Sequence, residues 1–232
     1  MDTNTFNNLI SQTWPDLHAA STLGGGTFGT VYACTKTDAV TGVTQKEAVK
    51  VVRVDFTPED RANADEEGIP FVDYYRAVKE KHLQEIRWMV ALKSPHIVHI
   101  NGYTAIEEPD LSALYILIRM DCLTALDQLR PAHLDDTPEQ AAALAEKVAL
   151  DICDALRVCH QNGVLHRDIK PANILCSDAG DFYLGDFGIS KDTAQQASMT
   201  SSGTLEYAPR EVMTGQYDHR ADLYSLGLVL YA

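Results

Sequence analysis

Cysteine, long apolar segments and positive charge are all scarce in this sequence. Its five cysteines are odd in number and scattered, without a Cys-x-x-Cys pair. This pattern argues against a disulfide framework or a zinc site and favours reduced thiols in the cytoplasm. The longest apolar runs, residues 113–118 and 226–231, fall far short of the roughly 20 residues that cross a membrane. No Lys- or Arg-led apolar segment opens the chain, so we expect no secretory signal.

The charge balance is strongly acidic. Nineteen Lys and Arg residues stand against 33 Asp and Glu residues, a net charge of −14 over 232 residues. Such a surface repels nucleic-acid phosphates and anionic lipids, so we expect neither as a partner. The length suits one large domain or two compact lobes, and nothing in the sequence indicates an oligomeric state.

Strand patterns dominate the first part of the chain and helical patterns the second. The β-prone runs are residues 31–34, 48–54 and 115–118. Helical periods cover residues 72–92, 138–161 and 222–231. Thr137 and Gln140 form a capping-box pattern at the start of the second helix, and Asn162-Gly163 stops it. Residues 56–69 are acidic and interrupted by Pro58 and Gly68, which predicts an irregular, exposed connection.

Each predicted helix has an expected buried side. Apolar spacing places one set of residues on the inner side of the first helix: Leu83, Ile86, Met89, Val90 and Leu92. We also expect Trp88 to pack, and Cys153 and Cys159 to share the inner side of the second helix. The third helix is apolar nearly all round, so we expect burial on every side and further helices beyond it.

A glycine-rich stretch comes directly before the first predicted strand, residues 31–34. Gly24, Gly26 and Gly29 satisfy G-x-G-x-x-G, and glycines let a backbone approach phosphate oxygens. A β-branched strand follows at once, which disfavours a dinucleotide-binding fold, and Thr30-Val31 stands where a Walker A loop needs Lys-Ser/Thr. The motif alone leaves two interpretations open, a phosphate loop and a tight glycine hairpin.

Three further segments carry polar side chains that suggest a binding site. Lys50 lies inside an apolar strand and needs a carboxylate partner if it is buried, for which Glu85 is the candidate; the alternative is an exposed lysine on an edge strand. Residues 166–173 (HRDIKPAN) gather a His, an Asp, a Lys and an Asn, which suits a loop that presents polar groups to a ligand. Asp186 ends a further β-like run, and its carboxylate with the Asn173 amide matches magnesium bound to phosphates.

Taken in order and spacing, these segments resemble a eukaryotic-type (Hanks-type) serine/threonine protein kinase. The matching segments are residues 24–31, 48–50, Glu85, 166–173, 186–188, Gly203-Thr204 with Tyr207, and Asp222. The resemblance implies a bilobal α+β fold with a β-rich N-lobe at residues 17–119 and an α-rich C-lobe at residues 120–232. The later helices of the family are missing, so the C-lobe is expected to be incomplete.

The resemblance also implies a role for each matching residue, with ATP and Mg²⁺ as cofactors. Asp168 would accept the proton of the substrate hydroxyl and Lys170 would steady the γ-phosphate, while Asn173 and Asp186 would bind magnesium. Met120 would be the gatekeeper and residues 121–123 the hinge, although Ile118 also fits the gatekeeper position. The implied ATP-binding residues are Leu23, Gly24, Gly26, Gly29, Val31, Ala48, Lys50, Glu85, Met120 and Leu175.

The expected reaction is transfer of the ATP γ-phosphate to Ser and Thr hydroxyls of proteins, including the activation segment at residues 186–211. Arg167 would pair with a phosphate there, and the candidate phosphosites are Thr200, Ser201 and Ser202. One alternative is a nucleotide-binding but inactive fragment or pseudokinase-like scaffold. The other is a small-molecule kinase, against which the HRDIKPAN loop and the peptide-receiving Gly203-Thr204 segment both argue.

Overall fold

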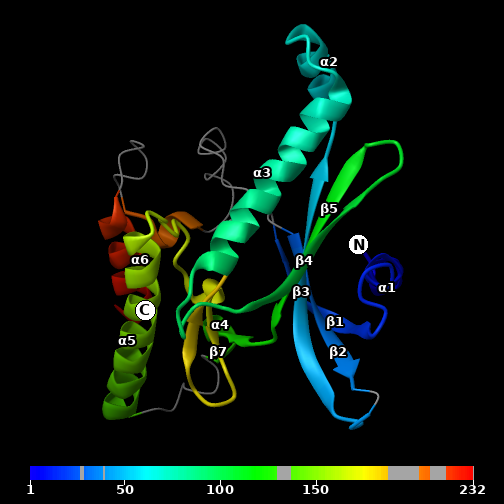
Figure 1. Ribbon diagram of the computed structural model, residues 1–232. Coiled ribbons are helices and arrows are strands. Elements are labelled where there is room, and N and C mark those ends of the chain that lie inside the picture. The colour runs from blue at the N-terminus through cyan, green and yellow to red at the C-terminus, as the bar shows by residue number, and fades with distance from the viewer. Residues whose placement is uncertain (27–28, 39, 130–136, 188–203, 210–217, 232) are drawn as a thin grey trace. The chain divides into compact units, whose positions relative to one another are not determined.

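The computed structural model describes residues 1–26, 29–38, 40–129, 137–187, 204–209 and 218–231 (Figure 1). The chain forms two compact units: unit 1 is Met1–Trp88 with His99–Cys122, and unit 2 is Met89–Val98 with Leu123–Ala232. Unit 1 is rich in β-strands and unit 2 in helices, as the α+β prediction requires. None of the helices in the described residues is both long and apolar enough to cross a membrane.

A five-stranded antiparallel sheet forms the body of unit 1. Its strands lie in the order β1-β2-β3-β5-β4. Their bounds are β1 Leu17–Gly26, β2 Gly29–Thr37, β3 Thr44–Asp55, β4 Ile100–Glu107 and β5 Ala113–Asp121. Strand β3 is central and is buried at six successive positions, residues 47–52. Both faces of the sheet are therefore covered along residues 47–52 of β3. The predicted strands at residues 31–34, 48–54 and 115–118 are confirmed.

Helix α1 (Thr3–Ile10) covers one face of the sheet and was not predicted from the sequence (Figure 1). The Asp2 carboxylate caps its first turn by accepting from the backbone N–H of Asn4 and Thr5. Phe6, fully buried, stacks on the Tyr32 ring with 3.9 Å between centroids. The helix is thus held by aromatic burial and by its cap, since Asn- and Thr-rich sequence has weak helix propensity.

Helix α3 (Phe71–Ala91) confirms the long helix predicted at residues 72–92. Its buried residues are Tyr75 and Ile86, and the Tyr75 hydroxyl donates to the Ala113 carbonyl of β5 at 3.1 Å. The expected inner positions of Val90 and Trp88 are wrong, because Val90 is 45% and Trp88 60% exposed. The buried stripe of α3 is therefore narrower than the apolar period indicates, and it excludes Trp88 and Val90.

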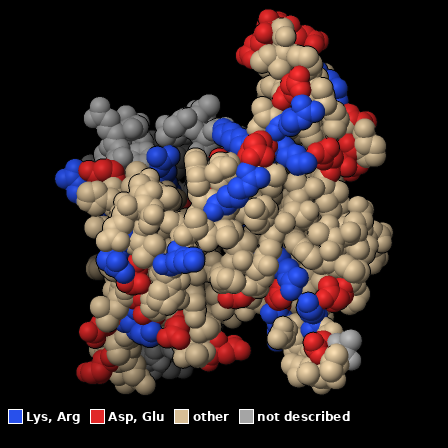
Figure 2. Space-filling view, in the orientation of Figure 1, with Lys and Arg blue, Asp and Glu red and all other residues tan. Residues whose placement is uncertain are grey.

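The prediction of an irregular connection at residues 56–69 is wrong, because α2 (Pro58–Glu66) lies there. Thr57 and Asp60 form a reciprocal capping box, and Pro58 occupies the first turn, where a missing N–H costs nothing. Acidic side chains gather over this helix (Figure 2), including Glu59, Asp65, Glu66 and Glu67. Pro58 and the acidic residues of the first turn stabilise the start of a helix here, so they do not indicate a loop.

Unit 2 is built on α5 (Pro138–Gln161), which carries the predicted Thr137–Gln140 capping box. α6 (His219–Tyr231) packs against α5, and a small sheet lies in the order β6-β7-β8. The remaining elements are β6 Thr124–Ala125, α4 Leu126–Leu129, the 3₁₀ turn η2 Pro171–Asn173, β7 Ile174–Cys176, β8 Phe182–Leu184 and the 3₁₀ turn η4 Thr204–Tyr207.

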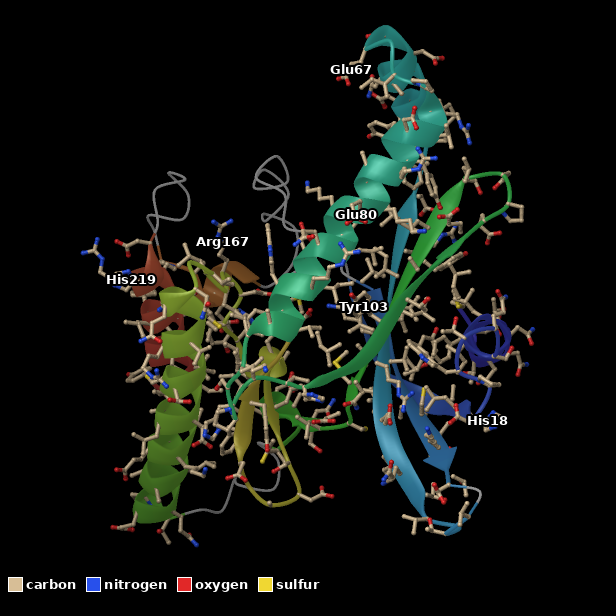
Figure 3. All side chains as sticks on the ribbon, viewed as in Figure 1. His18, Glu67, Glu80, Tyr103, Arg167 and His219 are labelled. Atoms are coloured by element: carbon tan, nitrogen blue, oxygen red, sulfur yellow. The ribbon has the colours of Figure 1, made fainter. Side chains whose placement is uncertain are left out.

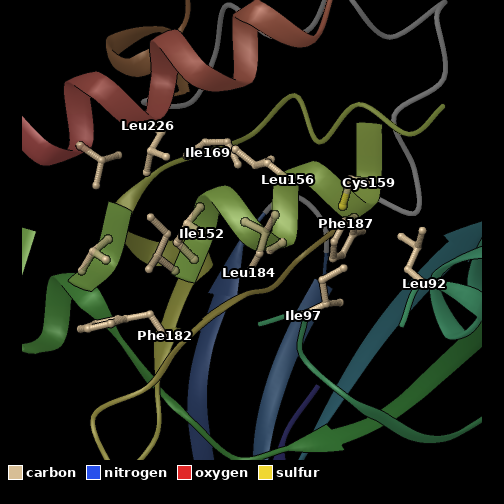
Figure 4. Close-up of a cluster of buried hydrophobic side chains, with 14 residues drawn as sticks. Leu92, Ile97, Ile152, Leu156, Cys159, Ile169, Phe182, Leu184, Phe187 and Leu226 are labelled. Carbon is tan, nitrogen blue, oxygen red and sulfur yellow. The ribbon is translucent and has the colours of Figure 1, made fainter. Parts of the chain in front are cut away.

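One apolar core joins these elements of unit 2. Figure 4 shows side chains of α5, β8 and α6 meeting in it. Its fully buried members are Ile152, Ala155, Cys159, Ile174 and Leu184. Cys153 does not share the inner side with Cys159, because it is exposed on α5. The expectation that the third helix is buried on every side is wrong, because α6 buries one side only; its exposed large apolar residues are Leu223, Tyr224 and Tyr231.

Replacing Phe6 with Ala should lower the free energy of unfolding of unit 1 by about 3–5 kcal/mol, since a fully buried aromatic ring leaves a cavity beside Tyr32. Urea unfolding followed by far-UV circular dichroism measures the change. Val40→Ala, at a 94% exposed position of the same unit, should shift stability by no more than about 0.5 kcal/mol. Equal effects of the two substitutions would show that α1 does not stabilise the sheet.

Candidate active site

The strand register gathers the predicted nucleotide residues of unit 1 on one face of the sheet. Lys50 of β3 lies opposite Val31 of β2 on one side and Ile118 of β5 on the other. Ala48 lies opposite Met120. Since directly opposed residues share a face and faces alternate along a strand, all five side chains lie on the same face. Small and apolar groups thus surround one buried ammonium, because Lys50 is only 6% exposed.

The glycine motif forms the end of the β1–β2 hairpin, with Gly26 opposite Gly29. Gly29 has φ +122°, and a Cβ there would lie 2.2 Å from the Val51 carbonyl oxygen of β3. Only glycine fits this backbone position, whereas a Cβ at Gly24 would meet nothing within 4 Å. Leu23, just before the motif, is 39% exposed. The motif therefore lies in a β-hairpin, and this geometry is compatible with both interpretations, a phosphate loop and a tight glycine turn.

Glu85, the predicted partner of Lys50, lies on α3 of the same unit. Its Oε2 atom is buried without a hydrogen-bond partner among the described residues and lies 3.7 Å from Nδ1 of His82. Lys50 also makes an interaction within the protein. The direct Lys50–Glu85 ion pair stays a prediction.

In unit 2 the structure brings Asp168, Lys170 and Asn173 together. The Asn173 amide nitrogen donates to the Asp168 backbone carbonyl at 2.8 Å and to its Oδ2 at 3.0 Å. Lys170 Nζ lies 3.2 Å from the same Oδ2. Asp168 is 4% and Asn173 4% exposed. The 3₁₀ turn η2 brings Asn173 back towards Asp168, so one buried carboxylate is fixed by an amide and offset by an ammonium.

Asp186 follows β8 and is tied to the same loop through its neighbours. The Gly185 N–H donates to the Asn173 carbonyl at 2.9 Å, and a ring nitrogen of His166 lies 2.8 Å from the Gly185 carbonyl. The Phe187 ring meets the His166 ring edge to face at 4.8 Å. Asp186 itself has φ +51°, a left-handed conformation that non-glycine residues seldom adopt. The surroundings therefore hold this carboxylate in a strained backbone position.

Asp222 was matched to the family motif without an assigned role, and the structure supplies one. Its carboxylate accepts from the backbone N–H groups of His166 at 3.0 Å and Arg167 at 2.8 Å. His160 Nε2 of α5 lies 2.8 Å from the same carboxylate, which is 2% exposed. Arg167 has φ +64° and an exposed side chain (Figure 3). The signal in the sequence was a lone Asp in an apolar helix, a position that requires polar partners.

Cys159 lies beneath this network and is not a nucleophile. Burial, with the Asp222 carboxylate adding to it, raises the pKa of its thiol to about 12. The thiol is therefore protonated at neutral pH and serves as core packing.

The oxygen chemistry of Asn173 and Asp186 fits a magnesium ion. The Asn173 amide nitrogen faces Asp168, so its oxygen is the atom left for a cation. The described residues contain no group of three or more His, Cys, Asp or Glu side chains that could hold a metal. A site of one amide and one carboxylate suits Mg²⁺, which takes few protein ligands when phosphates supply the others.

Leu175 and the candidate phosphosites lie apart from the residues described above. Leu175 lies on β7 in unit 2, half-buried, whereas the other predicted ATP-binding residues belong to unit 1. The candidate phosphosites Thr200, Ser201 and Ser202 lie outside the described residues.

The chain resembles known proteins over most of its length. The protein kinase domain family matches residues 17–232. Aurora kinase B of Drosophila melanogaster is 36% identical over 155 residues, 66% of this chain and 45% of that protein. The serine/threonine-protein kinase PknJ of Mycobacterium tuberculosis is 34% identical over 218 residues, 90% of this chain and 32% of that protein. PknB of Mycobacterium leprae is 41% identical over 156 residues, 64% of this chain and 24% of that protein. The chain thus spans less than half the length of these relatives.

Gly29→Ala should lower the free energy of unfolding by about 1–3 kcal/mol, because it adds a Cβ against the Val51 carbonyl and forces alanine to positive φ. Gly24→Ala is the matched control and should change stability by no more than about 0.5 kcal/mol, since its Cβ meets open space. Thermal unfolding monitored by circular dichroism compares them. Similar midpoints for both variants would contradict the close approach of the hairpin to β3.

Asp222→Asn should destabilise unit 2 by about 1–3 kcal/mol, because an amide offers one acceptor oxygen to two buried N–H groups. Asp178→Asn makes the same chemical change at an exposed position and should be neutral within about 0.5 kcal/mol. Chemical denaturation gives both values. Retention of full stability by Asp222→Asn would mean that the loop does not depend on the carboxylate.

Proposed function

Because the chain belongs to the protein kinase family, we propose that it transfers the ATP γ-phosphate to Ser and Thr hydroxyls of proteins, its own activation segment included. The observation that carries the proposal is the buried Asp168 carboxylate, fixed by Asn173 and offset by Lys170. The relatives named above as serine/threonine kinases support the same reaction. The division into an N-lobe at residues 17–119 and a C-lobe at residues 120–232 is part of this proposal.

In unit 1, the Lys50 face binds the nucleotide. Val31, Ala48 and Met120 contact the adenine, and Ile118 lies opposite Lys50 in the register, where it lines the same surface. The Lys50 ammonium binds the α- and β-phosphates, and Glu85 holds it in place. The glycine hairpin, with Leu23, Gly24, Gly26 and Gly29, covers the phosphates, because backbone N–H groups there can approach the phosphate oxygens closely.

In unit 2, the groups around Asp168 carry out the transfer. Asp168 accepts the proton of the substrate hydroxyl as its oxygen bonds to the γ-phosphorus, while the bond from that phosphorus to the β–γ bridging oxygen breaks and ADP leaves. The Asn173 amide keeps the carboxylate oriented for that step. Lys170 steadies the γ-phosphate charge. Asn173 and Asp186 hold Mg²⁺, which supplies neutralisation of the phosphate charge when bound. Leu175 contributes an apolar contact to the nucleotide.

A nucleotide-binding module without transfer is not favoured. Such a module needs no carboxylate held by an amide and an ammonium, yet Asp168, Asn173 and Lys170 are all present and in contact. The substrate class is therefore proteins bearing Ser or Thr, and Thr200, Ser201 and Ser202 are the proposed sites of autophosphorylation. We place the protein in the cytoplasm because its five cysteines are odd in number and scattered, without a Cys-x-x-Cys pair, a pattern typical of a reducing compartment.

Purified residues 1–232 with MgATP should incorporate phosphate into the chain, and Asp168→Asn should reduce the rate at least about 100-fold, the typical contribution of a positioned base. Labelling with γ-phosphate-labelled ATP and phosphopeptide mapping of residues 189–203 measure both effects. Chelating magnesium should abolish incorporation in the unsubstituted chain.

Asp178→Asn is the matched control, since it removes the same charge from an exposed turn and should keep the rate. Equal rates in Asp168→Asn and Asp178→Asn would overturn the assigned base. Binding of MgATP without incorporation into this chain or into a casein-like protein would support the inactive module instead.

A further inference from the structure

The face of the sheet opposite Lys50 carries an ion pair that no motif in the sequence indicated. Arg119 of β5 donates from Nη2 to Glu47 Oε1 of β3 at 2.7 Å, and its Nε donates to the second oxygen of the same carboxylate. Both carboxylate oxygens are thus used by one planar guanidinium. The side chains are 16% and 9% exposed. Because the pair is largely shielded from water, it stabilises the sheet only in this geometry. Displacing either side chain would leave the other charge buried without a partner.

The pair spans the two strands diagonally. Glu47 lies opposite Asp121 in the register, and Arg119 lies opposite Val49. A diagonal fork of this kind fits one register only, since a shift of one residue would send Arg119 to the other face. The ion pair therefore fixes how β3 and β5 align.

The segment before β1 covers this pair. Trp14 lies between α1 and β1, where its backbone N–H donates to the Ile10 carbonyl at 2.7 Å and its backbone carbonyl accepts from the Leu17 N–H at 3.1 Å. Arg119 Cζ lies 5.9 Å from the centre of the Trp14 ring, within the range of a cation–π contact. The ring also reaches Gly102 of β4, where a Cβ would lie 3.8 Å from Trp14 Cζ2. Trp14 thus shields the guanidinium from one side.

Each member of the pair has a sequence neighbour on the nucleotide face. Ala48 follows Glu47 and Met120 follows Arg119, and these two neighbours lie opposite each other. Because successive side chains point to opposite faces, the pair on one face sets the spacing of Ala48, Lys50 and Met120 on the other. We propose that Arg119 is a positioning residue for ATP, which acts through its fork on Glu47 under the cover of Trp14. The inference rests on the proposed function, because the bound nucleotide is ATP.

The same sheet contains a matched control for Arg119. Arg53 of β3 also pairs with a carboxylate, Asp55 at 2.8 Å, and lies over an aromatic ring, Tyr115 at 5.7 Å. It differs in being 58% exposed, so water screens its interactions. Trp88 is likewise a control for Trp14, since it is the other tryptophan of the chain and is 60% exposed on α3.

The experiment compares Arg119→Lys with Arg53→Lys, and Trp14→Leu with Trp88→Leu, in the 232-residue chain. Calorimetry gives the dissociation constant for MgATP, and phosphate transfer gives KM for ATP and kcat. We expect Arg119→Lys to raise the dissociation constant and KM at least about fivefold with kcat within about twofold, since lysine keeps the charge but loses the fork. Trp14→Leu should act in the same direction and more weakly. Both control variants should match the unsubstituted chain.

Equal values for Arg119→Lys and Arg53→Lys would overturn the proposal, as would a fall in kcat with an unchanged dissociation constant. If circular dichroism shows that Arg119→Lys is unfolded, the dissociation constant of Trp14→Leu for MgATP tests the proposal instead. Loss of the fold in both variants would overturn the proposal, because the pair would then have a purely structural role. MgATP binding without phosphate transfer in the unsubstituted chain would overturn the proposed function alone, because the dissociation constants still test positioning. No MgATP binding by that chain would overturn both proposals.

Discussion

The loop that carries the proposed base depends on one buried carboxylate, Asp222. It accepts the two consecutive N–H groups of His166 and Arg167, and without it both donors would be left unsatisfied in the interior of unit 2. The second of these residues has a left-handed backbone that costs about 1–3 kcal/mol. The carboxylate offsets that cost, so the turn before Asp168 keeps a single geometry. His160 contacts the same carboxylate from α5 and so connects the loop to this 24-residue helix.

The sheet of unit 1 is also stabilised by a few specific contacts. One face carries Lys50 among small apolar groups, and the other is covered by α1 and the Trp14 turn. Phe6 and Tyr32 bury apolar area on that face, while the directional hydrogen bonds between Arg119 and Glu47 fix the alignment of β3 and β5. A slip of one residue between β3 and β5 would turn both the buried apolar side chains and the Arg119 guanidinium to the wrong face. The two kinds of interaction are therefore complementary on the same surface.

Much of this arrangement could be predicted from the sequence. Helix α5 could be predicted because its capping box and its apolar period agree. For Lys50 the sequence left two alternatives, a buried lysine with a carboxylate partner and an exposed lysine on an edge strand, and the structure shows that Lys50 is buried. α1 could not be predicted, since its stability comes from Phe6 meeting a strand more than twenty residues away. Helix α2 was not predicted, because the Pro58 and acidic residues that begin it also occur in loops.

The missed contacts share one property, which is separation along the chain. Arg119 and Glu47 lie 72 residues apart, and their meeting follows from strand register alone. Asp222 lies 56 residues from His166. The wrong side chosen for Cys153 and Val90 has a different origin, because a helical period gives the direction of an apolar stripe but not its width.

The six successive buried positions of β3 have an evolutionary consequence. A strand with one solvent face can drift at every second residue, whereas this strand has no such residue between 47 and 52. Substitutions here are expected to arise in compensated pairs, Ala48 with Met120 on one face and Glu47 with Arg119 on the other. Residues on the two faces would then change together among descendants of this chain. A change in nucleotide preference on the Lys50 face would be accompanied by substitutions at Glu47 and Arg119 on the opposite face.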